Sequence, residues 1–246
     1  MLTPDPWLAA VLGWGVYRLD PPPHATKSVI KEALRSVAVQ ADHVLVFAKI
    51  PVDAVETCER LISTGFLPVD VGVSLESDGQ PILPSPDLAV LSVNIGEREA
   101  VGQIAESCFR LSRFHQDPRI SDCAANLVKR RWVESYVDGL RGDAMYIAHH
   151  ENQPVGFLAA MRSTDELGEI ALIDLIGISL EFQGRGIGRA LVYHFQKEWS
   201  DGHRRLRVGT QAANTSSICF YVAQGFQVYK SEFVLHLHYE DGIVIT

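Results

Sequence analysis

The sequence predicts an α+β protein in which helices flank a mixed β-sheet and a small α/β unit precedes the main part. Three observations support this fold class. Strand and helix patterns alternate regularly after Asp87. The stretch Ile170–Ile178 is almost continuously apolar, which is typical of a central strand buried on both faces. The proline-rich segment Ser77–Asp87 is the best boundary in the chain, so we expect domains at residues 1–86 and 87–246.

Patterns in residues 1–86 predict a strand, a helix and a second strand. These elements are expected over His43–Ile50, Asp53–Thr64 and Phe66–Leu75. Gly65 stands where a helix commonly ends, because glycine adopts the left-handed conformation of that position without strain. A unit of this size buries little apolar surface, so we expect it to fold poorly alone.

Residues 87–246 predict a longer series of alternating elements. A strand at Leu88–Val93 is followed by a helix whose apolar face repeats at helical spacing. The further elements are a helix over Asp122–Leu140, hairpin strands over Met145–His149 and Val155–Met161, the strand Ile170–Ile178, a helix carrying Ile187, Leu191 and Phe195, a strand over Leu206–Gly209, a helix over Thr215–Gln224, and two strands over Phe226–Val228 and Phe233–His238.

Composition and charge exclude several classes of protein. The chain has 246 residues, of which 47% are hydrophobic and 21% charged, so it can bury a large core and is not intrinsically disordered. The formal net charge is -8 and no run of lysine or arginine occurs, so we expect no nucleic-acid partner. No apolar run approaches the roughly 20 residues of a membrane helix, so we expect no membrane partner.

Cysteine usage indicates a reducing compartment. The four cysteines are widely spaced and have no histidine at metal-ligand spacing: Cys58, Cys108, Cys123 and Cys219. We therefore expect reduced thiols, a cytoplasmic location and no bound metal.

A glycine-rich turn follows the apolar strand at the point where a helix is expected to begin. Its residues are Gln183, Gly184, Arg185, Gly186, Ile187 and Gly188. Backbone N–H groups at such a turn are free to bind an anion such as a pyrophosphate, although an ordinary strand-to-helix turn has the same appearance. The turn is not a dinucleotide fingerprint, because Arg189 replaces the last glycine, and it lacks the lysine of a P-loop.

A second motif lies downstream and carries a family resemblance. It runs from Asn214 to Tyr221 and ends in Gly225-Phe226. The two motifs together resemble the GCN5-related N-acetyltransferase (GNAT) family over about residues 87–246. The chain departs from the family pattern at Leu180, where proline is frequent, and at Ser217, where alanine is frequent.

This resemblance implies a fold and a donor substrate. It implies a splayed sheet in which the strand ending at Ile178 separates from the strand ending near Gly209, with acetyl-CoA bound between them. Main-chain groups of Ile176, Gly177 and Ile178 would pair with pantetheine and polarise the thioester. The turn would hold the pyrophosphate through Gln183, Gly184, Arg185, Gly186, Ile187 and Gly188, and Asn214 would contact the donor from the next helix.

The resemblance also implies a general acid. Tyr221 would protonate the departing sulfur of coenzyme A, although a core tyrosine on a short helix is the structural alternative. Cys219 has no evident histidine partner, so we interpret it as a buried helix cysteine. The amine is therefore expected to attack the thioester directly.

Further segments extend the resemblance to one branch of the family. They are Ser112-Arg113-Phe114-His115 and Gly65-Phe66-Leu67-Pro68-Val69-Asp70, together with the N-terminal unit itself. They resemble the dTDP-fucosamine acetyltransferase family, which N-acetylates a nucleotide-linked amino sugar. By this resemblance Asp70 would hold or deprotonate the amine, Arg113 would bind the diphosphate, and Phe114 and His115 would shape the pocket. Asp70, Arg113 and His115 each have a structural alternative, which is a surface aspartate, a solvated arginine and a loop contact, respectively.

The N-terminal unit has two interpretations. The segment Cys58–Phe66 resembles Cys219–Phe226, with Leu61 in the place of the tyrosine. The unit is therefore either a degenerate partial copy of the acetyltransferase domain or an ordinary helix-glycine-strand arrangement.

Three functions remain. The leading hypothesis is an acetyl-CoA-dependent N-acetyltransferase acting on an amino-sugar nucleotide. One alternative is acetylation of a peptide N-terminus or another small amine, and another is a non-catalytic acyl-CoA sensor. A pocket with Arg113 pointing inward would favour the sugar nucleotide, whereas an open acidic groove around Asp70 would favour a peptide. A homodimer is compatible with each.

Overall fold

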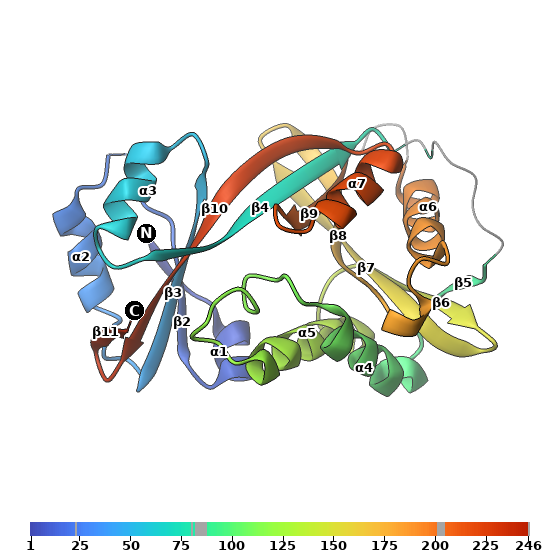
Figure 1. Ribbon diagram of the computed structural model, residues 1–246, viewed down its shortest axis with the longest axis horizontal. Coiled ribbons are helices and arrows are strands. Elements are labelled where there is room, and N and C mark those ends of the chain that lie inside the picture. Colours follow the sequence, from blue (N-terminus) through green and yellow to red (C-terminus); the bar gives the residue numbers. More distant parts are fainter. Residues whose placement is uncertain (23, 80, 82–87, 201–204, 246) are drawn as a thin grey trace.

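One β-sheet passes through the whole protein. The computed structural model describes residues 1–22, 24–79, 81, 88–200 and 205–245. Within them the sheet has 11 strands in the order β1-β2-β3-β10-β4-β9-β8-β7-β6-β5, and β11 pairs with β10. The long strands β4 and β10 connect the two ends of the molecule (Figure 1). Parallel and antiparallel neighbours both occur, so the α+β class with a mixed sheet is confirmed.

The elements before the proline-rich segment alternate between strand and helix. They are β1 (Leu2–Pro4), α1 (Pro6–Leu12), β2 (Gly15–Leu19), α2 (Lys27–Arg35), β3 (His43–Pro51), α3 (Val55–Ile62) and β4 (Leu67–Ser77). The expected strand, helix and strand correspond to β3, α3 and β4.

The later elements follow the expected order. They are β5 (Val90–Ser92), the short 3-10 helix η1 (Ile95–Glu97), α4 (Arg98–Cys108), α5 (Asp122–Val137), β6 (Ala144–His150), β7 (Gln153–Asp165), β8 (Gly168–Ile178), the 3-10 helix η2 (Leu180–Phe182), α6 (Ile187–Trp199), β9 (Arg205–Gln211), α7 (Thr215–Ala223), β10 (Gln227–Glu240) and β11 (Ile243–Ile245).

Two features differ from the sequence-based expectation. The segments predicted as two strands, Phe226–Val228 and Phe233–His238, belong to the single strand β10, which continues through a register shift between Val228 and Lys230. The bulge absorbs one residue without ending the pairing, so the polar stretch between the segments is not a turn. The elements of residues 1–35 were not predicted. The expected boundary near residue 87 falls partly outside the described residues, and the division at 86/87 remains a prediction.

The centre of the sheet has an internal two-fold repeat. Gly72 of β4 lies opposite Glu232 of β10, and these residues are 160 positions apart. The neighbouring strands keep the same offset: Gly72 also pairs with Gln211 of β9, and Glu232 also pairs with Pro51 of β3. The β4–β10 pairing has one register shift on each side of the Gly72–Glu232 pair. These shifts lie between Val228 and Lys230 and between Val234 and Leu235. The units β3-α3-β4 and β9-α7-β10 therefore each insert their last strand between the two strands of the other.

The helix ends of these two units match in detail. Gly65 and Gly225 have φ angles of 107° and 89°, the left-handed region that favours glycine. The next residues, Phe66 and Phe226, are fully buried, and the N–H of Phe226 donates to the carbonyl of Tyr221 at 3.0 Å. The sequence pattern Gly-Phe recurs because both helices end in a left-handed glycine followed by a buried phenylalanine.

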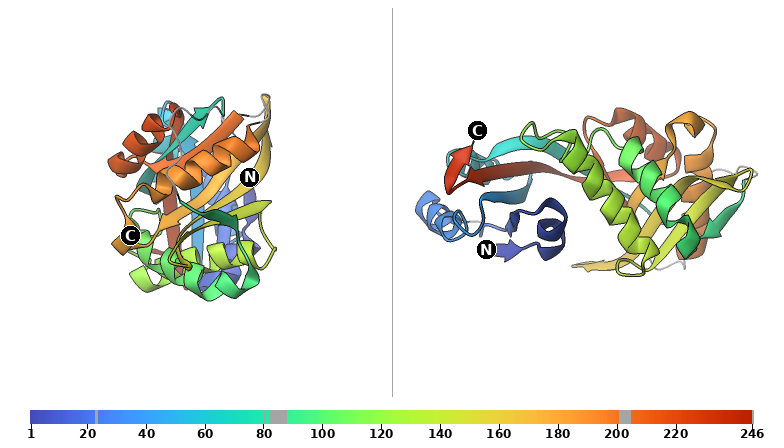
Figure 2. Two further views of the ribbon diagram at one scale, coloured as in Figure 1. Left: turned by 90° about the vertical axis from the view of Figure 1, so that its right-hand side faces the viewer. Right: turned by 90° about the horizontal axis from the view of Figure 1, so that it is seen from below.

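Helices cover both faces of the sheet. Beyond β4, helix α6 and Tyr221 of α7 pack on one face, while α4 and the C-terminal half of α5 pack on the other. The N-terminal half of α5 continues along the sheet and packs with α1 against β2 and β3. The views of Figure 2 show α4 and α5 together on one side of the sheet. Within the described part of the chain, no helix is long and apolar enough to cross a membrane.

A fragment of residues 1–79 should not fold cooperatively. Its strands β3 and β4 are each hydrogen-bonded to β10 rather than to each other, so the fragment lacks the strand that joins them. We expect no sigmoidal urea transition when its secondary structure is followed by circular dichroism. The full chain serves as the control. A cooperative transition of the fragment would contradict this prediction.

Candidate active site

Strands β8 and β9 separate part-way along their length. They pair in parallel only between Ile170–Ile173 and Arg205–Val208. Strand β8 nevertheless continues to Ile178, and β9 continues to Gln211. The expected splay between these strands is therefore present, and it leaves the end of β8 facing a groove.

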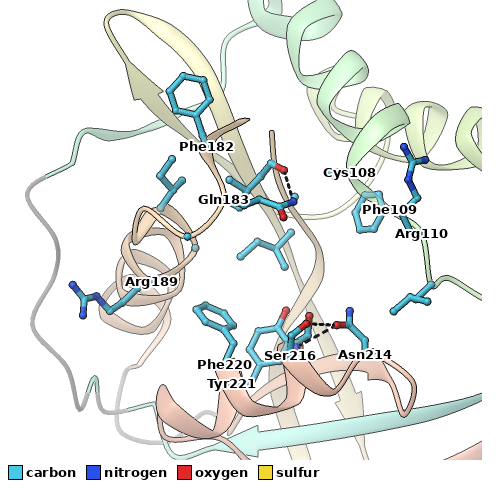
Figure 3. Close-up of a pocket in the computed structure, with 18 of the residues that line it drawn as sticks. Cys108, Phe109, Arg110, Phe182, Gln183, Arg189, Asn214, Ser216, Phe220 and Tyr221 are labelled. Atoms are coloured by element: carbon cyan, nitrogen blue, oxygen red, sulfur yellow. Dashed lines mark hydrogen bonds between the residues drawn. The ribbon is translucent and has the colours of Figure 1, made fainter. Parts of the chain in front are cut away.

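The groove has a volume of about 1090 Å³ and brings together all ten residues that we expected to bind acetyl-CoA. Figure 3 shows side chains that line it, contributed by η2, α6, α7 and the end of α4. The residues of that expectation are Ile176, Gly177, Ile178, Gln183, Gly184, Arg185, Gly186, Ile187, Gly188 and Asn214.

The glycine turn exposes the N-terminus of α6. Gly186 is the N-cap residue of this helix, with a φ of 80°, and no side chain caps the helix. Gly184 has a φ of 75°, and a Cβ there would meet no atom within 4 Å. The first backbone N–H groups of α6 are therefore left for an anionic ligand, which is what a pyrophosphate requires. The residues present fit the diphosphate of a coenzyme A thioester.

Polar side chains stabilise the walls of the groove through hydrogen bonds and a cation–π contact. Gln183 donates from Nε2 to the carbonyl of Ile178 at 3.3 Å, which links the turn to the end of β8. Asn214 caps α7, and its Oδ1 accepts from the N–H of Ser217 at 3.2 Å. The guanidinium of Arg185 lies 4.9 Å above the ring of Phe182. Leu180, where the family often has proline, lies in η2 and is exposed.

Two cysteines differ in their surroundings. Cys108 lines the groove, and a Cβ at Gly177 would come within 2.8 Å of its sulfur, so the glycine permits this contact. Burial raises the pKa of the Cys108 thiol to about 12, so this thiol is protonated at neutral pH. From the sequence, Cys108 was expected only to be a reduced thiol. Cys219 was expected to be buried, but its helix position is exposed, because α7 covers the sheet with the opposite side.

Tyr221 lies where two pockets meet. It is 4% exposed and lines both the groove and a second pocket. The rings of Phe220 and Phe226 contact it edge-on, with centroids 5.1 and 5.9 Å away, and fix its orientation. Burial raises the pKa of its phenol, so the hydroxyl keeps its proton at neutral pH.

The second pocket has a volume of about 440 Å³ and lies beside the two-fold centre of the sheet. Its charged lining consists of five basic and three acidic residues, although the whole chain carries a net charge of -8. They are Lys49, Arg113, Lys129, Arg207 and Lys230, and Asp70, Asp174 and Glu232. The pocket is thus locally cationic and can attract an anionic ligand that the whole protein would repel.

Asp70 contributes an acidic group with one carboxylate oxygen unpaired in the described part of the chain. It lies on β4, and its Oδ1 is buried and unpaired within the described residues. Burial raises the pKa of Asp70 to about 6. A carboxylate with this pKa can accept a proton near neutral pH.

The segment 112–115 divides into pocket and support residues. Arg113 lines the second pocket, with its guanidinium 4.0 Å above the ring of Phe47 and 4.5 Å above that of Phe114. Phe114 also lines this pocket and is itself buried. His115 is absent from the described lining of both pockets, and its two ring nitrogens contact Ser112 Oγ at 2.7 Å and Asn126 Oδ1 at 2.9 Å. These contacts hold the segment in place.

Behind Arg113 lies a fully buried polar cluster that sequence reasoning missed. Oδ2 of Asp117 accepts from His236 Nδ1 at 2.7 Å and from His238 Nε2 at 2.8 Å, and Arg119 pairs with the same carboxylate. The two imidazole N–H groups thus satisfy the carboxylate directly. The other nitrogen of His236 accepts from Arg113 at 3.4 Å. Alternation along β10 was the available signal, because His236 and His238 point to the same face.

Comparison with known families identifies the class of domain. Residues 141–228 match the family model described as an acetyltransferase (GNAT) domain. This region of the chain is therefore similar to the acetyltransferase domain of the GCN5-related N-acetyltransferase family.

The relatives extend beyond this region. The spore coat polysaccharide biosynthesis protein SpsD of Bacillus subtilis (strain 168) is 29% identical over 143 residues, which is 58% of this chain. That match covers 48% of SpsD, so the chain spans about half the length of this curated relative.

Solved structures share the fold. A GCN5-related N-acetyltransferase from Sphaerobacter thermophilus has a TM-score of 0.61 at 14% identity, over 99% of this chain and 77% of that one. A tandem GNAT protein from the clavulanic acid biosynthesis pathway has a TM-score of 0.59 at 13% identity, over 90% of this chain and 74% of that one. At these identities the likeness concerns the fold alone.

Replacing Asp70 by asparagine should stabilise the protein at pH 7. The pKa of Asp70 is about 6 in the folded protein, against an ordinary value of 3.8. The folded protein therefore binds more protons than the unfolded chain between these values, and its free energy of unfolding falls as pH rises through that window. Because Asp70 is partly exposed, we expect Asp70→Asn to gain about 1 kcal/mol at pH 7.

Urea unfolding at pH 4.5 and pH 7 measures this effect. The gain should be small at pH 4.5 and reach its full size at pH 7, whereas the exposed control Asp53→Asn should show no such trend. An equal change for Asp70→Asn at both pH values would show that its carboxylate carries no desolvation penalty.

Proposed function

We propose that the protein is an acetyl-CoA-dependent N-acetyltransferase that acts on the amine of a nucleotide-linked amino sugar. The observation that carries this proposal is the junction at Tyr221. A groove with an uncapped helix N-terminus meets a locally cationic pocket at this residue. A donor thioester in the groove and an acceptor in the pocket would thus share one phenol.

Features of the acceptor pocket favour a sugar nucleotide. Its volume of about 440 Å³ lies in the usual range of small-molecule sites. Arg113 lines the pocket and offers a planar donor suited to phosphate. The relative SpsD is described by its role in spore coat polysaccharide biosynthesis, which is consistent with a sugar substrate. An acidic groove around Asp70 would have favoured a peptide, but basic residues outnumber acidic ones there.

The chain offers one group for each proton movement. Acetyl-CoA, when bound, supplies the acetyl group as a thioester. The neutral amine attacks with its lone pair, and Asp70, with a pKa of about 6, accepts the proton that the nitrogen loses as it bonds to the acyl carbon. Tyr221, whose buried phenol remains protonated, donates its proton to the sulfur as the carbon–sulfur bond breaks.

The two cysteines support direct transfer rather than an acyl-enzyme. The Cys108 thiol is protonated at neutral pH, and the Cys219 side chain is exposed and absent from the described lining of the groove. A protonated thiol is a poor nucleophile. The amine would therefore attack the thioester in a ternary complex.

We also propose that residues 1–86 form a partial copy of the acetyltransferase domain that binds no donor of its own. The shared offset of 160 positions across the central pairs supports a copy. Leu61 stands in the place of Tyr221, and the turn after β2 contains Pro21 and Pro22 rather than glycines. We expect one acetyl-CoA per chain, and we retain a cytoplasmic location as a prediction.

The variant Tyr221→Phe should lose turnover but keep acetyl-CoA affinity. Only the acidic proton is removed, and a general acid contributes about 10² to 10⁴ in rate. The control Tyr229→Phe changes an exposed tyrosine on β10 and should be without effect. Calorimetry and a thiol-release assay measure the two quantities. Full turnover in Tyr221→Phe would remove this role.

An acceptor panel tests the proposed function itself. Thiol release from acetyl-CoA is compared between dTDP- and UDP-linked amino sugars and a set of peptides with free N-termini. We expect turnover with amino-sugar nucleotides only. Turnover with peptides only would overturn the sugar assignment and leave the acetyl-CoA groove unaffected. Binding of acetyl-CoA without turnover on any amine would favour a sensor over an enzyme.

A further inference from the structure

Lys129 is a buried cation in the wall of the acceptor pocket. It lies on α5 and is 7% exposed. Its ammonium group lies between two aromatic rings, 4.6 Å from the centroid of Phe109 and 4.9 Å from that of Trp132. Among the described residues it forms no ion pair and no hydrogen bond. Such a group is costly to bury unless a ligand supplies the missing partner.

The acid with the strongest effect on Lys129 already accepts several hydrogen bonds. Asp174 is the carboxylate that attracts Lys129 most, but its Oδ2 accepts from Trp132 Nε1 at 2.9 Å and from Tyr136 at 2.7 Å. Arg141 donates to the same oxygen at 2.9 Å. These hydrogen bonds hold the ring of Trp132 in the pocket wall. They also neutralise Asp174 through Arg141, so Lys129 has no anion of its own among the described residues.

A second cation faces the same pocket. Arg113 also lacks an ion pair within the described residues, and its contact with His236 Nε2 is long, at 3.4 Å. Burial and then the charge of Arg113 lower the pKa of Lys129 to about 8. Two unpaired cations that repel each other across one pocket would both be stabilised by a shared anion.

We propose that Lys129 and Arg113 form a phosphate subsite within the acceptor pocket, and that this subsite takes the diphosphate of a nucleoside diphosphate. The inference rests on the proposed function in placing the acceptor here. Two phosphate groups match two cations, and the planar guanidinium of Arg113 can donate two bonds to one of them. Neither residue lines the acetyl-CoA groove, so this subsite is separate from the glycine turn.

Binding of diphosphates to the protein in excess coenzyme A tests this subsite, because coenzyme A occupies the glycine turn. The probes are dTDP, UDP and inorganic pyrophosphate, measured by calorimetry. We expect dTDP or UDP to bind once per chain. Lys129→Met and Arg113→Met should each weaken that binding about tenfold or more, the usual effect of losing a charged hydrogen bond.

The control Lys197→Met changes an exposed lysine of α6 and should leave diphosphate affinity unchanged. Affinity for coenzyme A should be the same in all variants, which verifies that they fold. Lys129→Arg, which keeps the charge, should bind more tightly than Lys129→Met. Pyrophosphate binding that also depends on Lys129 would support a phosphate subsite, and tighter binding of the nucleotides would support the nucleoside diphosphate.

Diphosphate binding should also be accompanied by proton uptake, which the same titration can measure. The charged or titratable groups that act on Lys129 are Arg113, Asp174, Cys108 and Lys49. Near pH 8 a bound anion should complete the protonation of Lys129, so wild-type protein should take up a fraction of a proton and Lys129→Met should not. Heats measured in two buffers of different ionisation enthalpy report this uptake.

Two results would overturn the inference: no diphosphate binding in the presence of coenzyme A, or equal affinity in wild type, Lys129→Met and Arg113→Met. Neither result depends on turnover. Failure of the proposed function would instead appear in the acceptor panel as absence of acetyl transfer to amino-sugar nucleotides.

Discussion

Strand β10 lies between β3 and β4, and this pairing joins the two ends of the chain into one sheet. The matching insertion of β4 between β9 and β10 completes the arrangement. Each half depends on a strand of the other for its backbone hydrogen bonds, so neither half can move as a separate body without breaking a ladder. The acceptor pocket lies beside this two-fold centre and takes residues from both β4 and β10.

The splay between β8 and β9 opens a second space beside this pocket. Pairing stops after Ile173, and the groove that results meets the acceptor pocket at Tyr221. Tyr221, on a short helix, is among the residues that line both spaces. Strands β3 and β4 contribute Lys49 and Asp70 to the second pocket.

The charge of the site is set locally. The acceptor pocket collects basic side chains from β3, α5, β9, β10 and the segment before α5, in a chain whose net charge is negative. Asp117 and His236 behind Arg113, and Asp174 behind Trp132, hold two of the walls through buried hydrogen bonds. The site therefore combines fixed walls with two cations, Arg113 and Lys129, that form no ion pair within the described residues.

The sequence by itself determined the fold class and the set of residues, Tyr221 included, that line one groove. This was possible because the glycine turn and the Asn214–Phe226 segment are local patterns whose backbone consequences do not depend on distant residues. Local signals also located β3, α3 and β4. Only the tertiary structure decided that β10 is one strand, that β4 and β10 exchange places, and that Lys129, Asp70 and Arg113 face one pocket. Strand order and the burial of a charge depend on contacts between residues far apart in the chain, and hydropathy patterns along the sequence carry no information about which distant segment will supply them.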